Sequence, residues 1–301
     1  MIPRPTFRLS VLAVLLALTG CAGGDSTPVE MAQSGNLAPS CSGYPQTNSN
    51  GVTICELRQF DNLPATGLAS ISAQNGDILA QGSGRNTLKL DAYVYATAAT
   101  EQSAKDIASQ VTIHTDNNDF YATGPSTSGS TCNVNVNSVC VNTDGSSGSS
   151  ASDGDWRVSF AAGLPVQTSL NATSANGVVA VDGLSGSHDI SASNGSLYLS
   201  GLAGSLTAST SNGSIDLDLD APTWRGQGVD ASSSNGSIAF HAPAGYSAQF
   251  DLHSTNGSVH SDFSGQTKST PDAQLNETTG SGGPTLKASS TNGDVDLLKK
   301  S

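Results

Sequence analysis

The stretch Ser211-Asn212-Gly213-Ser214-Ile215-Asp216-Leu217 decides the fold, because six other segments of the chain repeat its pattern. Each copy centres on an Asn-Gly pair. The residue two places after the glycine is always Ile, Val or Leu, and the residue two places before the asparagine is always Ala, Ser or Thr. The residue four places after the glycine is apolar except in the sixth copy, which has Ser261 there. The seven asparagines are Asn75, Asn176, Asn194, Asn212, Asn235, Asn256 and Asn292.

Apolar and polar residues alternate on both sides of each Asn-Gly pair, which predicts two short strands per copy, each with one buried face. An Asn-Gly loop also favours an antiparallel hairpin. The copies nevertheless repeat by translation, with 18 residues from Asn176 to Asn194 and 18 from Asn194 to Asn212. Such repeats are typical of a solenoid. The sequence therefore predicts an all-β, parallel β-helix-like solenoid of tandem Asn-Gly repeats with one short helix; an antiparallel β meander or sandwich is the alternative.

The two faces of each predicted strand have different roles. A single repeat cannot offset the entropy of ordering its backbone, so neighbouring repeats must share a core. We expect Ile215 and Leu217 to lie in that core and Asp216 to point outward. Small residues beside the corner, such as Ala192, Thr210 and Ser233, fit a tight turn. We expect the corner asparagines to hydrogen-bond from one repeat to the next, as in other asparagine ladders.

Composition excludes some classes of partner. Charged residues make up 12% of the chain and the net charge is −13 at pH 7. A nucleic-acid-binding protein needs a basic face that displaces counterions, and anionic lipid attracts basic rather than acidic proteins. The sequence therefore argues against nucleic acid and against electrostatic attraction to a membrane.

The N-terminus has the pattern of a targeting segment. Arg4 and Arg8 precede a short apolar run that is too short to span a membrane. Leu18-Thr19-Gly20-Cys21 looks like a bacterial lipobox, so residues 1–20 are interpreted as a lipoprotein signal peptide and Cys21 as the lipidated residue; an ordinary signal peptide is the alternative. Ala22, in place of an aspartate, resembles proteins sent on to the outer membrane. Residues 21–40 are expected to be a flexible tether.

Four further cysteines, Cys41, Cys55, Cys132 and Cys140, remain in the mature chain. An even number in an oxidising compartment suggests two disulfides, and four cysteines allow three connectivities. The local pairing, Cys41 with Cys55 and Cys132 with Cys140, is the preferred one. No spacing resembles a zinc site, and we expect neither a metal nor a cofactor.

Two regions follow the tether. Residues 41–155 are expected to form a β-rich region that contains the first Asn-Gly copy, a helix over 99–110 and a disulfide-tied hairpin around Cys132 and Cys140. Residues 156–301 are expected to carry the solenoid repeats. An insertion over 264–284 accounts for the long spacing before the last copy.

A strand, a helix over 99–110 and a second strand precede the segment Trp156-Arg157-Val158-Ser159-Phe160-Ala161-Ala162-Gly163, and tandem Ser-Asn-Gly-Ser-Ile-x-Leu units follow it. This arrangement resembles the bacterial putative-adhesin family, also called domain of unknown function 4097, whose members are β-strand-repeat proteins. The resemblance covers residues 60–301. It implies a β-solenoid-like fold on the cell envelope and no enzyme activity, because the family has no catalytic residues to carry over.

The candidate reactive groups are carboxylates and histidines. Asp216, Asp218 and Asp220 should point outward together, and Asp182 and Asp251 could join them on neighbouring rungs. Clustered carboxylates on such a face can cleave polysaccharide or hold calcium. The alternative is that these aspartates belong to a solvated strand face, where their charges discourage aggregation. The five histidines are dispersed and are expected to lie on the surface; His253 and His260 flank Asn256-Gly257 and could converge at one corner.

These features predict a lipid-anchored protein of the bacterial cell envelope, most simply at the outer membrane. Its expected role is that of a non-catalytic structural or interaction module, adhesin-like, with envelope glycan or protein as the possible partner. The alternative is a carbohydrate-active enzyme or glycan-binding protein that uses the exposed aspartate face.

Overall fold

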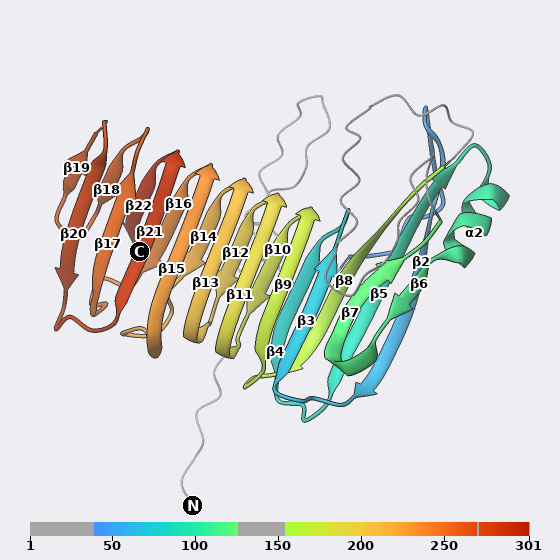
Figure 1. Cartoon of the computed structure of the whole chain (residues 1–301), viewed down its shortest axis with the longest axis horizontal. Coiled ribbons are helices and arrows are strands. Elements are labelled where there is room, and N and C mark those ends of the chain that lie inside the picture. The colour runs from blue at the N-terminus through green and yellow to red at the C-terminus, as the bar shows by residue number, and fades with distance from the viewer. Residues whose placement is uncertain (1–38, 126–153, 270, 301) are drawn as a thin grey trace, which may run out of the picture. The chain divides into compact units, whose positions relative to one another are not determined.

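The repeats fold into two stacked sheets that are joined at the Asn-Gly corners (Figure 1). The structure is a computed structural model that describes residues 39–125, 154–269 and 271–300, all within one structural unit, Leu37–Ser301. The expected signal peptide, residues 21–38 of the expected tether, which include Cys21, and the hairpin around Cys132 and Cys140 lie outside the described residues. Within the described ranges, no helix has both the length and the apolar character that crossing a bilayer requires.

The larger sheet has 12 strands and the smaller sheet has 10 in the described residues. In spatial order, the larger sheet contains β1 (Gln46–Asn48), β2 (Gly51–Leu63), β5 (Leu88–Ala98), β8 (Asp155–Pro165), β4 (Ile78–Ser83), β10 (Val179–Asp182), β12 (Leu197–Ser200), β14 (Ile215–Asp218), β16 (Ile238–Ala242), β22 (Val295–Lys299), β18 (Val259–Ser261) and β19 (Gln266–Lys268). The smaller sheet contains β20 (Ala273–Thr279), β17 (Ala248–Ser254), β21 (Thr285–Asn292), β15 (Gly226–Asn235), β13 (Ala203–Asn212), β11 (Ser185–Asn194), β9 (Ser169–Asn176), β3 (Leu68–Ala73), β7 (Asp119–Thr123) and β6 (Thr112–His114).

Each repeat contributes one strand to each sheet, and equivalent strands of neighbouring repeats pair in parallel. In the smaller sheet β9, β11, β13 and β15 pair in this way, with Asn176, Asn194, Asn212 and Asn235 in register. In the larger sheet β10, β12, β14 and β16 do the same. The solenoid prediction is therefore confirmed, and the antiparallel meander is wrong for the repeats. The hairpin interpretation of Asn-Gly is also wrong, because the two strands that flank each pair belong to different sheets.

The core consists of rows of equivalent side chains between the sheets. Period-two alternation places every second residue inward, and the row that contains Ile215 is buried in every rung. That row runs through Ile78, Val179, Leu197, Ile215, Ile238, Val295 and Val259. Its neighbour contains Leu217 and ends at Ser261, which is also buried. The rows confirm that the repeats share one continuous core.

Close stacking of the corners explains why each of them needs glycine. A Cβ atom on Gly195 would overlap the carbonyl oxygen of Gly177, and one on Gly213 would overlap the carbonyl oxygen of Gly195. The small residue before the corner has a second role that the sequence did not reveal. Its hydroxyl donates to a glycine carbonyl of the preceding rung, as Ser233 Oγ does to Gly213 O at 3.0 Å. Hydrogen bonds of the same kind start from Ser174, Thr210, Ser290 and Ser254.

The last repeat does not lie at the end of the stack. Strands β21 and β22 insert between the rung formed by β15 and β16 and the rung formed by β17 and β18, as the red strands in Figure 1 show. The insertion over 264–284 makes this crossing possible. It also supplies β19 and β20, which pair antiparallel with the outer edges of β18 and β17.

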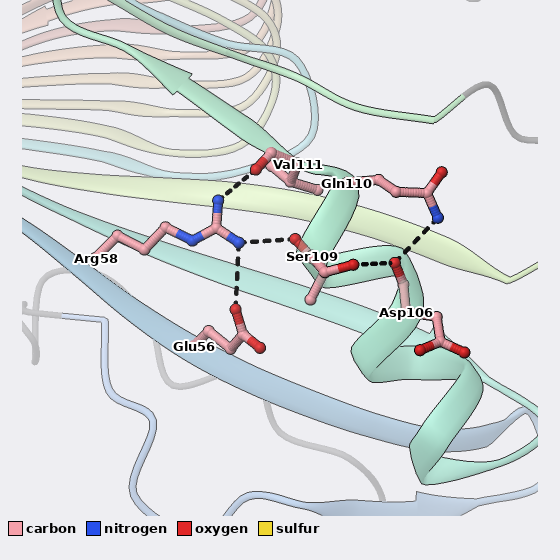
Figure 2. Close-up of polar contacts among 7 residues, drawn as sticks. Glu56, Arg58, Asp106, Ser109, Gln110 and Val111 are labelled. Carbon is pink, nitrogen blue, oxygen red and sulfur yellow. Dashed lines mark hydrogen bonds and ion pairs between the residues drawn. The ribbon is translucent and has the colours of Figure 1, made fainter.

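The N-terminal part is built differently. Strands β2, β5 and β8 pair antiparallel, and helix α2 (Glu101–Gln110) packs Ala104 and Ala108 against them. Thr100 caps the helix by accepting from Ser103 N at 3.1 Å. At the other end the Arg58 guanidinium donates to the carbonyl oxygens of Ala108, at 2.7 Å, and Val111 (Figure 2). A cation at this position complements the partial negative charge of a helix C-terminus.

The first Asn-Gly copy joins the two regions. Although it lies within residues 41–155, β3 and β4 pair in parallel with β9 and β10 of the second copy. Strand β8 starts at Asp155, the last residue of the first predicted region, and pairs with both β5 and β4. A short 3-10 helix, η1 (Asp116–Asn118), precedes β7, which extends the smaller sheet beyond β3.

Candidate functional site

The expected acidic face lies on the outer surface of the larger sheet, but Asp216, Asp218 and Asp220 each pair with a basic side chain. Asp216 and Asp218 point outward from β14, and Asp220 follows that strand. Lys300, which follows β22, forms ion pairs with Asp218 and with Asp220, the latter at 2.6 Å between Nζ and Oδ1. His241 Nε2 on β16 lies 3.3 Å from Asp216 Oδ2.

The pKa values of the two basic groups reflect these pairs. The hydrogen bond to Asp216 raises the pKa of the His241 imidazole, against an opposing effect of burial. Burial lowers the pKa of the Lys300 ammonium, but its bonds to Asp218 and Asp220 outweigh this effect and the net shift is upward. Both groups are therefore held in the protonated form more strongly than they would be in water.

This arrangement differs from a catalytic pair of carboxylates. A hydrolase of this type needs one protonated carboxylic acid and one ionised carboxylate at a shared gap, whereas here Asp218 and Asp220 pair with the Lys300 ammonium and Asp216 pairs with the His241 imidazole. The described residues contain no group of three or more His, Cys, Asp or Glu side chains that could hold a metal ion. The geometry fits a strand face on which Lys300 and His241 pair with the carboxylates of β14 and of the residue that follows it.

The two aspartates that were expected to join this face behave differently. Asp182 lies on the same outer surface, on β10, which is separated from β14 by β12. Its carboxylate accepts a hydrogen bond from Ser200 Oγ at 2.7 Å. Asp251 belongs to β17 of the smaller sheet and is aligned with Lys287. The possibility that Asp251 joins Asp216 is therefore wrong, because the two residues lie in different sheets.

The histidines do not form a site. His253 and His260 lie on β17 and β18, which belong to opposite sheets, and they pair separately with Asp272 at 2.6 Å and with Asp262 at 3.0 Å. The possibility that they converge at one corner is therefore wrong, because their strands lie in different sheets.

His188 corrects the expectation of surface histidines, because it is only 3% exposed. Neither ring nitrogen has a well-formed hydrogen bond in the described residues. Burial lowers the pKa of His188, and the backbone at Ala203 and Leu184 opposes this shift only in part.

The seven corner asparagines form one continuous ladder. Beyond Asn75, which begins the ladder, each side-chain Nδ2 donates to the Oδ1 of the asparagine in the preceding rung, at 2.8–3.0 Å, through all six steps of the stack. The order follows the spatial stack, so Asn292 lies between Asn235 and Asn256. The ladder runs along an exposed corner and links every rung to its neighbours.

The N-terminal cysteines form one disulfide, between Cys41 and Cys55, with 5.2 Å between their Cα atoms. Because Cys55 is aligned with Tyr95 on β5, the bond ties the loop that starts at Cys41 onto the outer surface of the larger sheet.

Sequence reasoning missed a groove beside this disulfide. It has a volume of about 250 Å³ and is lined by Tyr44, Gln46, Asn48, Thr53, Tyr95, Thr97, Asp155, Trp156 and Arg157. The Arg157 guanidinium lies 4.6 Å from the centre of the Tyr95 ring, and the Tyr44 ring contacts Tyr95 edge-on at 5.5 Å. The alternation of outward residues on β5 and β8 is visible in the sequence. The pairing of these two strands, which are about 60 residues apart, cannot be predicted from it.

The outer surface of the smaller sheet carries a hydroxyl array, which is a row of serine and threonine side chains, and the adjacent outward row includes the charged residues Asp189, Asp230 and Lys287. One row across it contains Ser72, Thr173, Ser191, Ser209, Ser232 and Ser289. A shallow hollow of about 270 Å³ on this surface is lined mainly by such serine and threonine residues. The surface is continuous across the rungs because the strands pair in register.

Comparisons with known proteins place these features in a family. The model of the family described as Toastrack DUF4097 matches residues 62–298. Two solved structures are similar: a putative cell adhesion protein from Clostridium sporogenes, with a TM-score of 0.40, 10% identity and coverage of 82% of this chain and 100% of that one, and a putative adhesin from Bacteroides fragilis, with a TM-score of 0.36, 12% identity and coverage of 85% and 99%. No curated protein matches the chain. Because the family model covers most of its length, the chain belongs to the Toastrack DUF4097 family.

Proposed function

We propose that this chain is a lipid-anchored protein of the bacterial cell envelope whose β-solenoid is a non-catalytic, adhesin-like interaction module. The observation that carries the proposal is the hydroxyl array on the outer surface of the smaller sheet, whose serine and threonine side chains repeat in register over the rungs. Repeat proteins use such extended surfaces to bind extended ligands. The partner we propose is envelope glycan or protein.

The rigidity of the stack supports this role. The asparagine ladder and the hydroxyl-to-glycine bonds fix each rung against the next at the corner. A surface that is already ordered loses little conformational entropy when it binds a partner. The solenoid is thus suited to hold many weak polar contacts in a fixed spacing.

The charge pairing on the larger sheet supports a non-catalytic role. Asp216 faces His241, and Asp218 and Asp220 face Lys300. Neither pair leaves a carboxylic acid and a carboxylate facing each other, which glycoside hydrolysis requires. A carbohydrate-active enzyme on this face therefore has less support than a binding module.

The anchor and location are proposed from the lipobox Leu18-Thr19-Gly20-Cys21. Two or more acyl chains on Cys21 would make membrane attachment stable, where one chain gives only reversible binding. The Cys41–Cys55 disulfide is compatible with an oxidising compartment outside the cytoplasm.

The test uses cells that express the full chain. We expect radiolabelled palmitate to enter the wild-type protein and not the Cys21→Ser variant, and protease added to intact cells to remove the solenoid if it faces outward. Labelling that persists in Cys21→Ser would refute the anchor, and protection from the protease would refute an adhesin-like role toward other cells. In parallel, polysaccharide cleavage that is lost in Asp216→Asn and Asp218→Asn would favour the enzyme instead.

A further inference from the structure

We infer that the groove beside the Cys41–Cys55 disulfide, lined by Tyr44, Tyr95 and Arg157, binds one sugar ring of a neutral glycan. This inference rests on the proposed function. It deepens that function by adding a defined recognition site on a different surface from the hydroxyl array. The groove lies on the outer surface of the larger sheet, where β1, β2, β5 and β8 are adjacent.

The floor of the groove is formed by three hydrogen-bonded strands. Thr53 on β2, Thr97 on β5 and Asp155 on β8 are aligned across three paired strands, and so are Cys55, Tyr95 and Arg157. The hydroxyls of Thr53 and Thr97 are 2.8 Å apart and hydrogen-bonded. Tyr95 is only 7% exposed, so its ring supports the site rather than moving within it.

The lining combines apolar ring surface with planar polar groups. The half-buried Tyr44 forms one wall and can pack against the C–H face of a sugar. Arg157 and Asp155 are two residues apart on β8, so their side chains lie on the same surface of the sheet. The guanidinium offers several hydrogen-bond donors beside the carboxylate, which is an acceptor. This pairing complements two neighbouring hydroxyl groups on a ring, and Gln46 adds an amide with both functions.

The main donor of the groove is free to bind a ligand. The Arg157 guanidinium stacks on Tyr95, and within the described residues it forms neither a hydrogen bond nor an ion pair. Asp155 uses Oδ1 to accept from the backbone of Trp156. The indole of Trp156 packs on the hydrophobic core and donates to Pro125 O at 2.9 Å, so it braces the strand from the other side.

Size and charge select the ligand. A volume of about 250 Å³ lies below the roughly 300–1,000 Å³ of pockets that take a drug-sized molecule, so a single ring fits. The site has one cation and one anion, Arg157 and Asp155, on a chain of net charge −13, which disfavours acidic ligands. The exposed Gln46 and Asn48 leave the rim open, so the rest of a glycan can extend into solvent.

The test measures saccharide binding by saturation-transfer difference NMR, which suits weak affinities. The full chain is purified in a detergent without a sugar headgroup and titrated with triacetylchitotriose, maltotriose and, as a competitor class, a trialanine peptide. We expect at least one saccharide to bind with a dissociation constant of about millimolar order. Tyr44→Ala should weaken binding about fivefold to tenfold, and Arg157→Ala about tenfold or more.

Matched controls separate binding from folding. Tyr198→Ala and Arg225→Ala remove the same side chains elsewhere on the protein and should leave the affinity unchanged, while Tyr44→Phe should retain it. Reduction of the Cys41–Cys55 disulfide should lower the affinity for saccharide, because it releases the segment that carries Tyr44 from the strands beneath it. Binding of the peptide alone, no saccharide binding by folded protein, or equal losses in the control variants would overturn the inference. If these appear while envelope labelling and protease accessibility are as expected, the proposed function stands without this site.

Discussion

The repeats and the N-terminal part of this chain reach stability in different ways. In the repeats, every rung offers its neighbours the same main-chain edge, the same inward rows and the same corner asparagine. In the N-terminal part, each contact is particular: a capped helix, an arginine on its C-terminus and one disulfide hold antiparallel strands together. The difference teaches that the repeat encodes how rungs stack but not which rung lies next to which. The insertion of β21 and β22 between earlier rungs is the direct example.

The largest expected effect tests the shared core of the repeats. Ile215 is 1% exposed between the sheets, so Ile215→Asp buries an unpaired charge and should cost at least about 4 kcal/mol of unfolding free energy. Asp216→Ala changes the adjacent outward residue and should cost no more than about 1 kcal/mol. Urea denaturation measures both, and equal losses would contradict the assignment of the two faces.

The disulfide tests whether the N-terminal part depends on its own constraint. Cys41 and Cys55 are 14 residues apart, and opening a loop of this length should cost about 3 kcal/mol. In Cys41→Ser/Cys55→Ser, hydrogen exchange should accelerate first in β1, β2 and α2, with protection retained in β11 and β13. Uniform loss of protection would show that the two regions unfold as one cooperative unit.

A corner glycine tests the close stacking of rungs. In Gly195→Ala the new methyl group meets the carbonyl oxygen of Gly177, and shifting the backbone should cost about 1–3 kcal/mol. Gly84→Ala is the matched control, because nothing lies within 4 Å of the added Cβ. Thermal unfolding of the two variants should differ clearly; similar melting temperatures would remove steric stacking as the reason for glycine.

His188 tests the cost of a polar group in an otherwise apolar row. His188→Leu should stabilise the protein by about 1–2 kcal/mol, because it removes a buried imidazole without a good partner. Burial lowers the pKa of His188 below its ordinary 6.5. The unfolded chain therefore takes up the proton first, and stability that is complete above pH 6.5 falls as the pH drops below it. Denaturation at several pH values should show a smaller acid loss in the variant, and an unchanged pH dependence would count against this account.

The asparagine ladder should give the smallest effect. Asn212 has a ladder bond on each side, whereas Asn256 at the end has one. Because these bonds are exposed to water, Asn212→Ala should cost about 1 kcal/mol and Asn256→Ala about half as much. Chemical denaturation resolves this difference if the dependence of the unfolding free energy on denaturant concentration is the same in both variants. An equal cost at both positions would indicate that the asparagine acts within its own corner rather than between rungs.

Local patterns predicted much of the architecture. Alternation around Asn212-Gly213 identified the buried Ile215 and the outward Asp216, and translation of the pattern identified parallel stacking. Helix α2 was expected over 99–110 from the spacing of its apolar residues and is observed at Glu101–Gln110. These features depend on residues close together in the chain.

The candidate sites were harder to predict from the sequence than the architecture was. Lys300 reaches Asp218 and Asp220 only because the last rung lies beside β16, and the sequence offers no sign of that order. The groove depends on Tyr44, Tyr95 and Arg157, which the disulfide and two antiparallel pairings bring together. Asp251 and His253 were misplaced because they precede their Asn-Gly pair, whereas Asp216 follows its own pair, and the strands before and after each pair join different sheets.

The sequence by itself determined the repeating unit, the side of each strand that is buried and the residue types that a stacked corner tolerates. All three follow from short-range sterics and from the period of a β-strand. Only the tertiary structure decided the order of the rungs, the ion pairs on the larger sheet and the groove at its N-terminal end. Backbone hydrogen bonds between strands are the same whichever repeat supplies them, so the choice of neighbour depends on the insertion and on long-range packing.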